Sequence, residues 1–210
     1  MKLDERLQEL EEMVLTMATQ VRSMMEQSKE ALLQNRKDQA LFIIESDAHI
    51  NNLELEINET SVSILSLLQP VASDLRRVLA ALKISNDLER IGDYAKNIAR
   101  YVIKNEKFPV LLVEEAEMLF KIFFENFDQV IEVINTDDVK LAYQTAEADE
   151  LMDGSFKKIA NKVDKENREN NQINFATIGL LRNIERAGDH TKNICEHVIY
   201  RKKSQYVDFG

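Results

Sequence analysis

Proline and glycine, the residues that most often end helices, are scarce in this chain. Two Pro and five Gly are present among 210 residues, so long uninterrupted helices are possible along almost the whole sequence. The share of apolar residues, 44%, and of charged residues, 30%, is ordinary for a globular protein. We therefore expect an all-α fold, in which Pro70 and Pro109 mark the two clearest interruptions.

The spacing of apolar residues predicts six helices joined by short polar connections. They are expected over residues 3–34, 37–68, 71–105, 110–135, 137–169 and 172–202. Asn35 is expected to cap the second helix, Pro70 to open the third, and the segment 136–138 to cap the fifth. Because short connections make neighbouring helices antiparallel, two up-down-up three-helix bundles follow.

The chain also contains an internal duplication. Residues 88–98 and 184–194 lie 96 positions apart and are identical at seven of eleven positions. Both copies read Glu-Arg-x-Gly-Asp followed by Lys-Asn-Ile, whereas the flanking segments have diverged. A unit of three helices that occurs twice predicts a domain boundary close to Pro109. The expected parts are a first repeat at 1–107, a second repeat at 108–203 and a C-terminal tail at 204–210.

One face of each repeated segment is apolar and is predicted to form a core seam. The seam residues are Ile84, Leu88, Ile91, Ala95, Ile98 and Val102 in the first copy, and Leu180, Ile184, Ala187, Thr191, Ile194 and Val198 in the second. Gly92 and Gly188 flank the seam, at points where a partner helix is expected to approach closely.

The opposite face of each segment carries acids that core packing does not explain. At about 100° per residue, Glu89, Asp93 and Asn97 lie roughly 140° to 220° away from Ile84. The second copy places Glu185, Asp189 and Asn193 in the same way. Solvated acidic faces are common on helices, but recurrence at identical offsets in two diverged segments favours a functional role.

Paired carboxylates in this arrangement indicate a cation site. Two carboxylates one helical turn apart repel each other by a few tenths of a kcal/mol, and a bound cation removes that cost. Oxygen ligands suit Mg²⁺, Mn²⁺, Ca²⁺ or iron, and the lack of paired Cys or His argues against a closed structural zinc site. One helix supplies too few ligands, so further acids must come from a neighbouring helix.

The further acids are sought where the second and fifth helices match, at residues 47–51 and 149–153. This match proposes Asp47 in the first half, with Asp149 and Asp153 in the second. Asp47 also lies near an apolar seam of its own helix, so a capping or hydrogen-bonded role is equally open for it.

Other chemistry-bearing residues have simpler explanations. His190 and His197 align with Tyr94 and Tyr101, so a role needed in both halves would not be kept by imidazole. Cys195 aligns with an alanine and is expected to be a small buried residue. Glu-x-x-His pairs, Gly-rich phosphate loops and nucleophile elbows are absent from the sequence, so catalysis is not indicated.

The charge balance limits the partners that the chain can have. A formal net charge of -10 disfavours nucleic acid and anionic lipid, both of which are bound by clustered Lys and Arg. The amino-terminal residues are charged, and no apolar run approaches the length of a membrane-spanning helix. We therefore expect a cytoplasmic protein without direct membrane insertion.

These motifs together resemble the PhoU family. Asp-Leu-Arg at 74–76 stands near the start of the third helix, and Glu-Arg-x-Gly-Asp follows at 89–93 and again at 185–189. The resemblance covers essentially the whole chain. It implies a cytoplasmic regulator of phosphate uptake that restrains the phosphate-starvation response. Such a regulator contacts the ATPase of a Pst-type phosphate ABC transporter and a PhoR-type phosphate sensor histidine kinase.

The resemblance also implies bound metal at the Glu-x-x-x-Asp motifs, as iron, zinc or other cations such as manganese and magnesium. Carried over by position, the ligands are Glu89, Asp93, Glu185 and Asp189, with Asn97 and Asn193 as additional candidates. The second half departs from the pattern, because residues 170–175 contain no counterpart of Pro70, Asp74 and Arg76.

Three other functions stay open at this point. The chain could be a metal-independent helical scaffold whose acidic faces meet basic partner surfaces. It could be the accessory protein of a Pit-type phosphate carrier. A metal-dependent hydrolase is the third, because carboxylate clusters can activate water through a metal. Homodimerisation is expected for amphipathic bundles of this kind, although no unpaired apolar stripe in the sequence identifies an interface.

Overall fold

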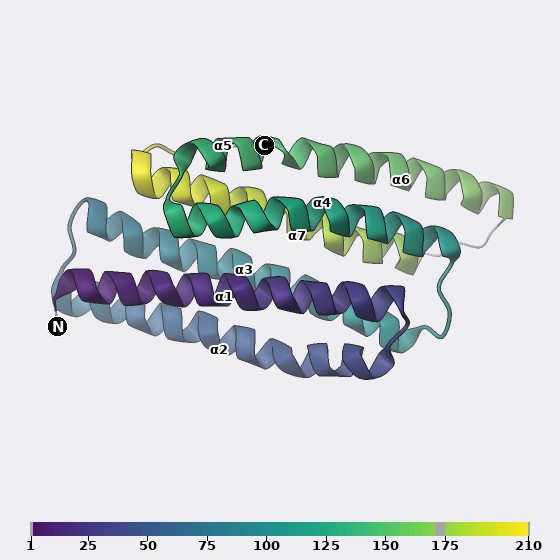
Figure 1. Ribbon diagram of the computed structural model, residues 1–210, viewed down its shortest axis with the longest axis horizontal. Coiled ribbons are helices and arrows are strands. Elements are labelled where there is room, and N and C mark those ends of the chain that lie inside the picture. Colours follow the sequence, from purple (N-terminus) through teal and green to yellow (C-terminus); the bar gives the residue numbers. More distant parts are fainter. Residues whose placement is uncertain (1, 171–174, 210) are drawn as a thin grey trace.

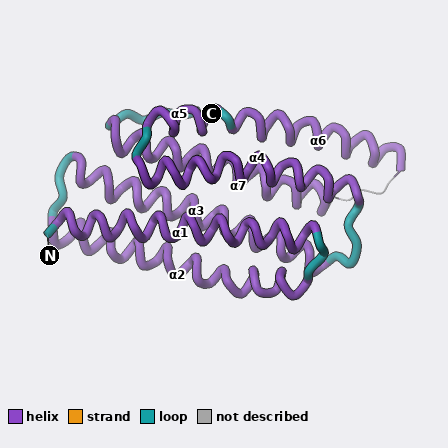
Figure 2. Tube along the Cα trace, viewed as in Figure 1, coloured by secondary structure: helices purple, strands orange, loops and turns teal. Residues whose placement is uncertain are grey.

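The computed structural model describes residues 2–170 and 175–209, and these residues contain helices and no strands (Figures 1 and 2). The helices are α1 (Leu3–Leu33), α2 (Lys37–Leu68), α3 (Ser73–Lys104), α4 (Val110–Thr136), α5 (Val139–Glu147), α6 (Asp149–Asn170) and α7 (Phe175–Lys203). The predicted all-α fold is confirmed. Residues 171–174, where the last helix was expected to begin, lie outside the described residues.

The predicted fifth helix is interrupted at Ala148 and forms α5 and α6. The amide of Leu151 donates to the carbonyl of Ala148 at 3.1 Å, which is a bond between residues three apart. The helix therefore tightens locally and continues, instead of reversing. Lack of Gly or Pro at this point explains why the sequence pattern showed one helix.

The predicted caps have mixed outcomes. Asp138 caps α5 as expected, because its Oδ1 accepts hydrogen bonds from the amides of Lys140 and Leu141 at 2.9 and 3.1 Å. The cap assigned to Asn35 is wrong. This residue has a φ of 51°, and its Nδ2 donates to the carbonyl of Glu106 at 2.8 Å. Asn35 thus ties the α1–α2 turn to the chain after α3.

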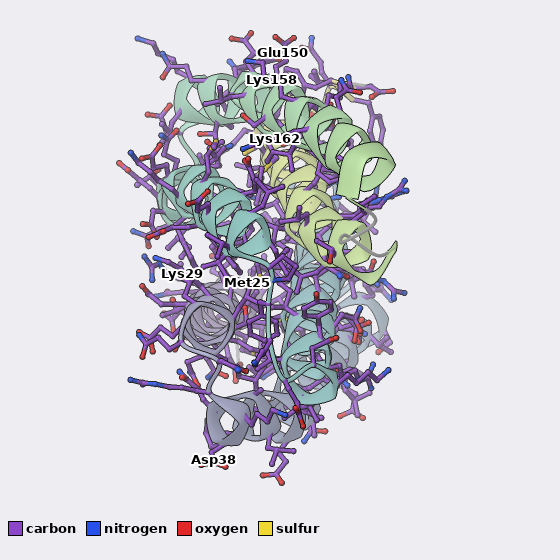
Figure 3. The ribbon with its side chains drawn as sticks, turned by 90° about the vertical axis from the view of Figure 1, so that its right-hand side faces the viewer. Met25, Lys29, Asp38, Glu150, Lys158 and Lys162 are labelled. Atoms are coloured by element: carbon purple, nitrogen blue, oxygen red, sulfur yellow. The ribbon has the colours of Figure 1, made fainter. Side chains whose placement is uncertain are left out.

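The helices form two layers that share one hydrophobic core. Helices α1–α3 make one layer and α4–α7 the other, and the layers meet where α3 packs on α7 and α1 packs on α4 (Figure 1). Viewed along the helices, Met25 of α1 lies near the middle, whereas Asp38 of α2 and Glu150 of α6 lie at opposite edges (Figure 3). All twelve predicted seam residues of α3 and α7 are buried, so these two helices are central.

The two glycines of the repeat lie at close helix contacts, as predicted. A Cβ added at Gly92 would lie 3.3 Å from Cγ2 of Ile50, and one added at Gly188 would lie 3.2 Å from Cγ of Met152. Glycine therefore lets α2 approach α3 and lets α6 approach α7. Among the helices of residues 2–170 and 175–209, none is long and apolar enough to cross a membrane.

Candidate metal centre

Three carboxylates meet where α6 packs on α7. Asp149 and Asp153 stand one turn apart at the start of α6, and Asp189 projects from α7. One oxygen from each residue lies within 4.8 Å of the others. The approach depends on Gly188, because a Cβ there would lie 3.3 Å from Oδ1 of Asp149. The duplicated glycine thus admits the acid of the neighbouring helix into the cluster.

A fourth carboxylate, Glu185, lies one turn before Asp189 and lines the same hollow of about 400 Å³ as Asp153 and Asp189. Within the described part of the chain, Oε2 of Glu185 and Oδ1 of Asp149 are buried and have no hydrogen-bond partner. Buried polar atoms are nearly always paired in folded proteins, so these two unpaired carboxylate oxygens call for an explanation. A bound cation would provide a partner for such an oxygen.

The electrostatics of this cluster are unfavourable without a cation. Burial raises the pKa of Asp149, Glu185 and Asp189 above the ordinary carboxylate values, and the neighbouring carboxylates add to the rise. Lys192 opposes the rise, with its Nζ 3.2 Å from Oδ2 of Asp149. The charged forms of the acids are nevertheless disfavoured overall. Hard oxygen donors in this state fit a divalent cation.

In the first half, the lysine of the motif contacts two of the corresponding acids. The Nζ of Lys96 lies 2.6 Å from Oδ2 of Asp47 and 2.8 Å from Oδ1 of Asp93, so the ammonium group bridges α2 and α3. Asn51 also donates to Oδ2 of Asp47 at 3.3 Å. Asp47 is buried, with 7% of its surface exposed. The hydrogen-bonded role that the sequence left open for Asp47 is therefore present in the structure.

Glu89 completes the first cluster from α3. Nε of Arg90 lies 3.6 Å from Oε2 of Glu89. Burial raises the pKa of Glu89, and the nearby charges of Asp93 and Glu54 raise it further. Sequence reasoning missed Glu54, which lies seven residues after Asp47 on the same face of α2. Its spacing of two helical turns was the available signal.

The repeated acids are less open to solvent than expected. They lie opposite the seam, as predicted, but the side chains of Glu89 and Asp93 are only 17% and 29% exposed. Helix α3 contacts α1, α2 and α7, so even its polar face is partly covered. Arg90 and Arg186 of the repeat are exposed.

The two repeated asparagines lie between the halves of the molecule. Nδ2 of Asn97 lies 3.5 Å from Oδ1 of Asn183, and Nδ2 of Asn193 lies 3.3 Å from Oδ1 of Asp87. Both contacts join α3 to α7. Asn193 lines the hollow next to Glu185 and Asp189, although its amide nitrogen is engaged with Asp87.

Asp87 also accounts for the positions of two histidines, with which it forms hydrogen bonds. Nδ1 of His190 lies 2.7 Å from Oδ1 of Asp87, and Nε2 of His197 lies 3.0 Å from Oδ2. Burial would raise the pKa of Asp87, but the hydrogen bonds to the two imidazoles outweigh it and hold the pKa below the usual value. Sequence reasoning missed this residue. The signal was a polar residue beside the seam in both copies, Asp87 and Asn183.

Cys195 is fully buried, as predicted, and burial raises the pKa of its thiol to about 12. A thiol in this state is neutral at physiological pH, and it acts as a small apolar side chain.

Comparison with known proteins adds to this picture. The PhoU domain model matches residues 14–102 and 117–198. The phosphate-specific transport system accessory protein PhoU homolog 1 of Thermotoga maritima is 34% identical over 163 residues, which are 75% of this chain and 70% of the relative. The phosphate-specific transport system accessory protein PhoU of Escherichia coli is 30% identical over 204 residues, which are 95% of this chain and 84% of the relative.

Two solved structures match the fold over nearly the whole chain. The crystal structure of PhoU from Pseudomonas aeruginosa has a TM-score of 0.92 and 28% identity, covering 97% of this chain and all of that one. The phosphate transport system regulatory protein PhoU from Streptococcus pneumoniae has a TM-score of 0.90 and 25% identity, covering 99% of this chain and all of that one. The matched motifs, the duplicated helical unit and these relatives show that the chain belongs to the PhoU family.

Proposed function

We propose that this protein is a cytoplasmic accessory regulator of phosphate transport. It acts as an adaptor between the ATPase of a Pst-type transporter and a PhoR-type sensor histidine kinase, and it restrains the phosphate-starvation response. The observation that carries the proposal is the match of the PhoU domain to both halves of the chain. The relatives named above are accessory and regulatory proteins of phosphate transport, which supports this role over an enzymatic one.

The proposal includes a metal ion, bound first in the second half. Asp149, Asp153 and Asp189 hold the cation, and Glu185 contributes its unpaired oxygen. Iron, manganese, magnesium and zinc all accept carboxylate ligands. When bound, the cation supplies positive charge between α6 and α7. The carboxylates then stay ionised, and the two helices are held together.

Metal binding in the first half has a further cost. A cation held by Glu89 and Asp93 must compete with the ammonium group of Lys96, which already neutralises Asp93 and Asp47. Lys192 competes in the same way at Asp149, but its contact of 3.2 Å is longer, and the second half has Asp153 where the first has Asn51, so we expect the first site to be the weaker of the two. This order of affinities follows from the packing of α2 on α3, because the repeated motif itself is the same in both halves.

Elemental analysis after mild purification tests the metal sites. The Glu185→Gln/Asp189→Asn variant should lose the more tightly held ion, and Glu89→Gln/Asp93→Asn should lose only weakly held metal. Glu114→Gln/Glu117→Gln, which alters two exposed acids on α4, is the matched control. An ion content that is the same in all four proteins would refute the assignment.

A metal-independent scaffold is the second candidate, and α2 favours it. Residues 38–75 contain seven acids and neither Lys nor Arg. Leu41, Leu55 and Val62 are 51%, 54% and 62% exposed on the solvent side of this helix. These exposed apolar side chains share one face of α2 with acids, whereas the sequence alone identified no unpaired apolar stripe. A basic amphipathic partner suits this face, and pairing of the same face in two copies would bring acids together.

Binding to the transporter ATPase separates the two candidates. The purified ATPase should bind the metal-loaded protein and lose it in chelator if metal organises the adaptor. Binding that persists in chelator, and that is lost in a Leu55→Lys/Val62→Lys variant, supports the scaffold instead.

A further inference from the structure

Several cations lie close together at one end of the helical assembly, although the chain carries a net charge of -10. Helix α7 ends there with Arg201, Lys202 and Lys203. Helix α3 begins beside it and contributes Arg76 and Arg77. Four of these cations line a hollow of about 400 Å³, together with Ser73 and three carboxylates.

Each carboxylate in this hollow already has a cation partner. Nε and Nη2 of Arg77 donate to the two oxygens of Glu11 at 2.9 and 2.8 Å. Arg201 pairs with Asp137, which also lies 2.8 Å from Nζ of Lys202. The third acid, Asp74, lies 3.8 Å from Nη1 of Arg77. The acids of the hollow are therefore neutralised within the protein.

Two arginines of the hollow keep a buried donor without a partner among the described residues. Arg76 makes no ion pair with any residue that the structure describes, and its buried Nε has no hydrogen-bond partner. Arg201 is 7% exposed, and its Nε is likewise buried without a partner. Its Nη1 lies 3.6 Å from Glu11, and its Nη2 contacts Asp137 and the carbonyl of Ile134, so Nε is the donor that is left for a further acceptor. Burial lowers the pKa of Arg201 although the charge of Glu11 opposes this. A buried donor without a partner favours an additional acceptor.

The amino terminus of α3 also favours a bound anion at this hollow. This helix has 32 residues, and no side chain caps its first turn in the described part of the chain. Its N-cap residue, Ala72, adopts a φ of 46°, which is unusual for a residue with a side chain. Ser73 and Asp74 place this first turn at the hollow. Uncapped amides at a helix amino terminus favour an anion.

We propose that this hollow is a binding site for a tetrahedral oxyanion, either phosphate or a phosphoryl group. Its donors are Nε of Arg76, Nε of Arg201 and the amides of Ser73 and Leu75, since the amide of Asp74 donates to the carbonyl of Val71. The hollow is larger than a phosphate ion, so a phosphate ester also fits. The sequence does not repeat its key residue, because Arg76 aligns with Gln172 in the second repeat. The site is separate from the metal centre, and it stands whether or not the chain binds metal.

Calorimetric titration of the full chain with inorganic phosphate, and separately with O-phosphoserine, tests this site. A chelator in the buffer prevents phosphate from binding through metal at the acidic clusters, and chloride keeps the ionic strength constant. We expect saturable binding that is at least about tenfold weaker in Arg76→Gln, because a charge-assisted donor is lost. Arg36→Gln, at the α1–α2 turn, is the matched control and should bind as the wild type does.

A second measurement distinguishes a loss of binding from a loss of folding in the variant. Amide resonances of residues 73–77 should shift on titration in the wild type and stay unchanged in Arg76→Gln, whose dispersed spectrum reports that it is folded. Binding of inorganic phosphate supports a free ion as ligand, and binding of phosphoserine alone supports a phosphoryl group on a larger molecule. If neither binds, or if Arg76→Gln binds as well as wild type, the proposal is wrong.

Discussion

The two halves carry the same motif, but the acids of the motif have different partners in each half. In the first half, Lys96 bridges Asp47 and Asp93 at 2.6 and 2.8 Å. In the second half, Lys192 lies 3.2 Å from Asp149, and two carboxylate oxygens remain buried without a hydrogen-bond partner among the described residues. The repeated helix is thus nearly constant, whereas its neighbour decides whether the acids are neutralised within the protein.

A single substitution on the neighbouring helix accounts for much of this difference. Asp47 and Asp149 correspond, because they lie three residues before Ile50 and Met152, which face the equivalent glycines. Asn51 therefore corresponds to Asp153. An amide donates a hydrogen bond to the buried acid, whereas a carboxylate adds repulsion that a cation can relieve. Duplication followed by such a change yields one cluster that its lysine bridges and one cluster with an additional carboxylate.

The largest expected effect comes from removing the bridging lysine. Lys96→Met leaves Asp47 and Asp93 without their ammonium partner, and breaking such a partly buried pair should cost about 3 kcal/mol of unfolding free energy in chelator. Excess Mn²⁺ should restore most of this loss, because the cation can then take the place of the ammonium group between the two carboxylates. Urea unfolding with and without metal measures both values. A loss that is unchanged by metal would contradict the comparison between the halves.

The next largest effect comes from exchanging Asn51 and Asp153, the corresponding residues that differ between the two clusters. Asp153→Asn should weaken divalent-cation binding in the second half by about tenfold, since one ligand is lost. Asn51→Asp should strengthen binding in the first half, where it adds the missing carboxylate. Calorimetric titration with Mn²⁺ measures each affinity, and the double variant should show the order of the two sites reversed. Unchanged affinities in both single variants would show that this position does not set the difference.

The fold was readable from the sequence because its determinants are local. Few Gly and Pro, an apolar seam of period 3.6 and two glycines at helix contacts predicted the bundle and its central helices. The interruption at Ala148 escaped this reasoning, because it is marked neither by glycine nor by proline. The division into domains at 107 and 108 remains a prediction.

The candidate site could be predicted only in part from the sequence, because its ion pairs and hydrogen bonds join residues that are distant in the chain. The motif placed Glu185 and Asp189 on one face, but the burial of Asp149 depends on how closely α6 packs. The reach of Lys96 to Asp47 and the hydrogen bonds of Asp87 with His190 cross between helices. Periodicity within one helix carries no information on such contacts.

The smallest expected effect is the pH dependence of the second cluster. The pKa values of Asp149 and Asp189 are raised in the folded protein, so the folded state binds protons more tightly than the unfolded state does. Their contribution to stability is fully present below the ordinary aspartate pKa of 3.8 and is lost as pH rises through the raised values. Saturating divalent cation should reverse this trend, because metal competes with protons for the same oxygens.

Thermal unfolding of wild type and of Asp149→Asn/Asp189→Asn from pH 4 to pH 7 isolates this contribution. Asp87, whose pKa is lowered, contributes stability that is lost as pH falls, and it cancels in the difference between the two proteins. In chelator, wild type should lose stability relative to the variant as pH rises. With metal, it should gain. A difference that does not change with pH in chelator would mean that the second cluster is as well neutralised as the first, and the contrast between the halves would then rest on ligand number alone.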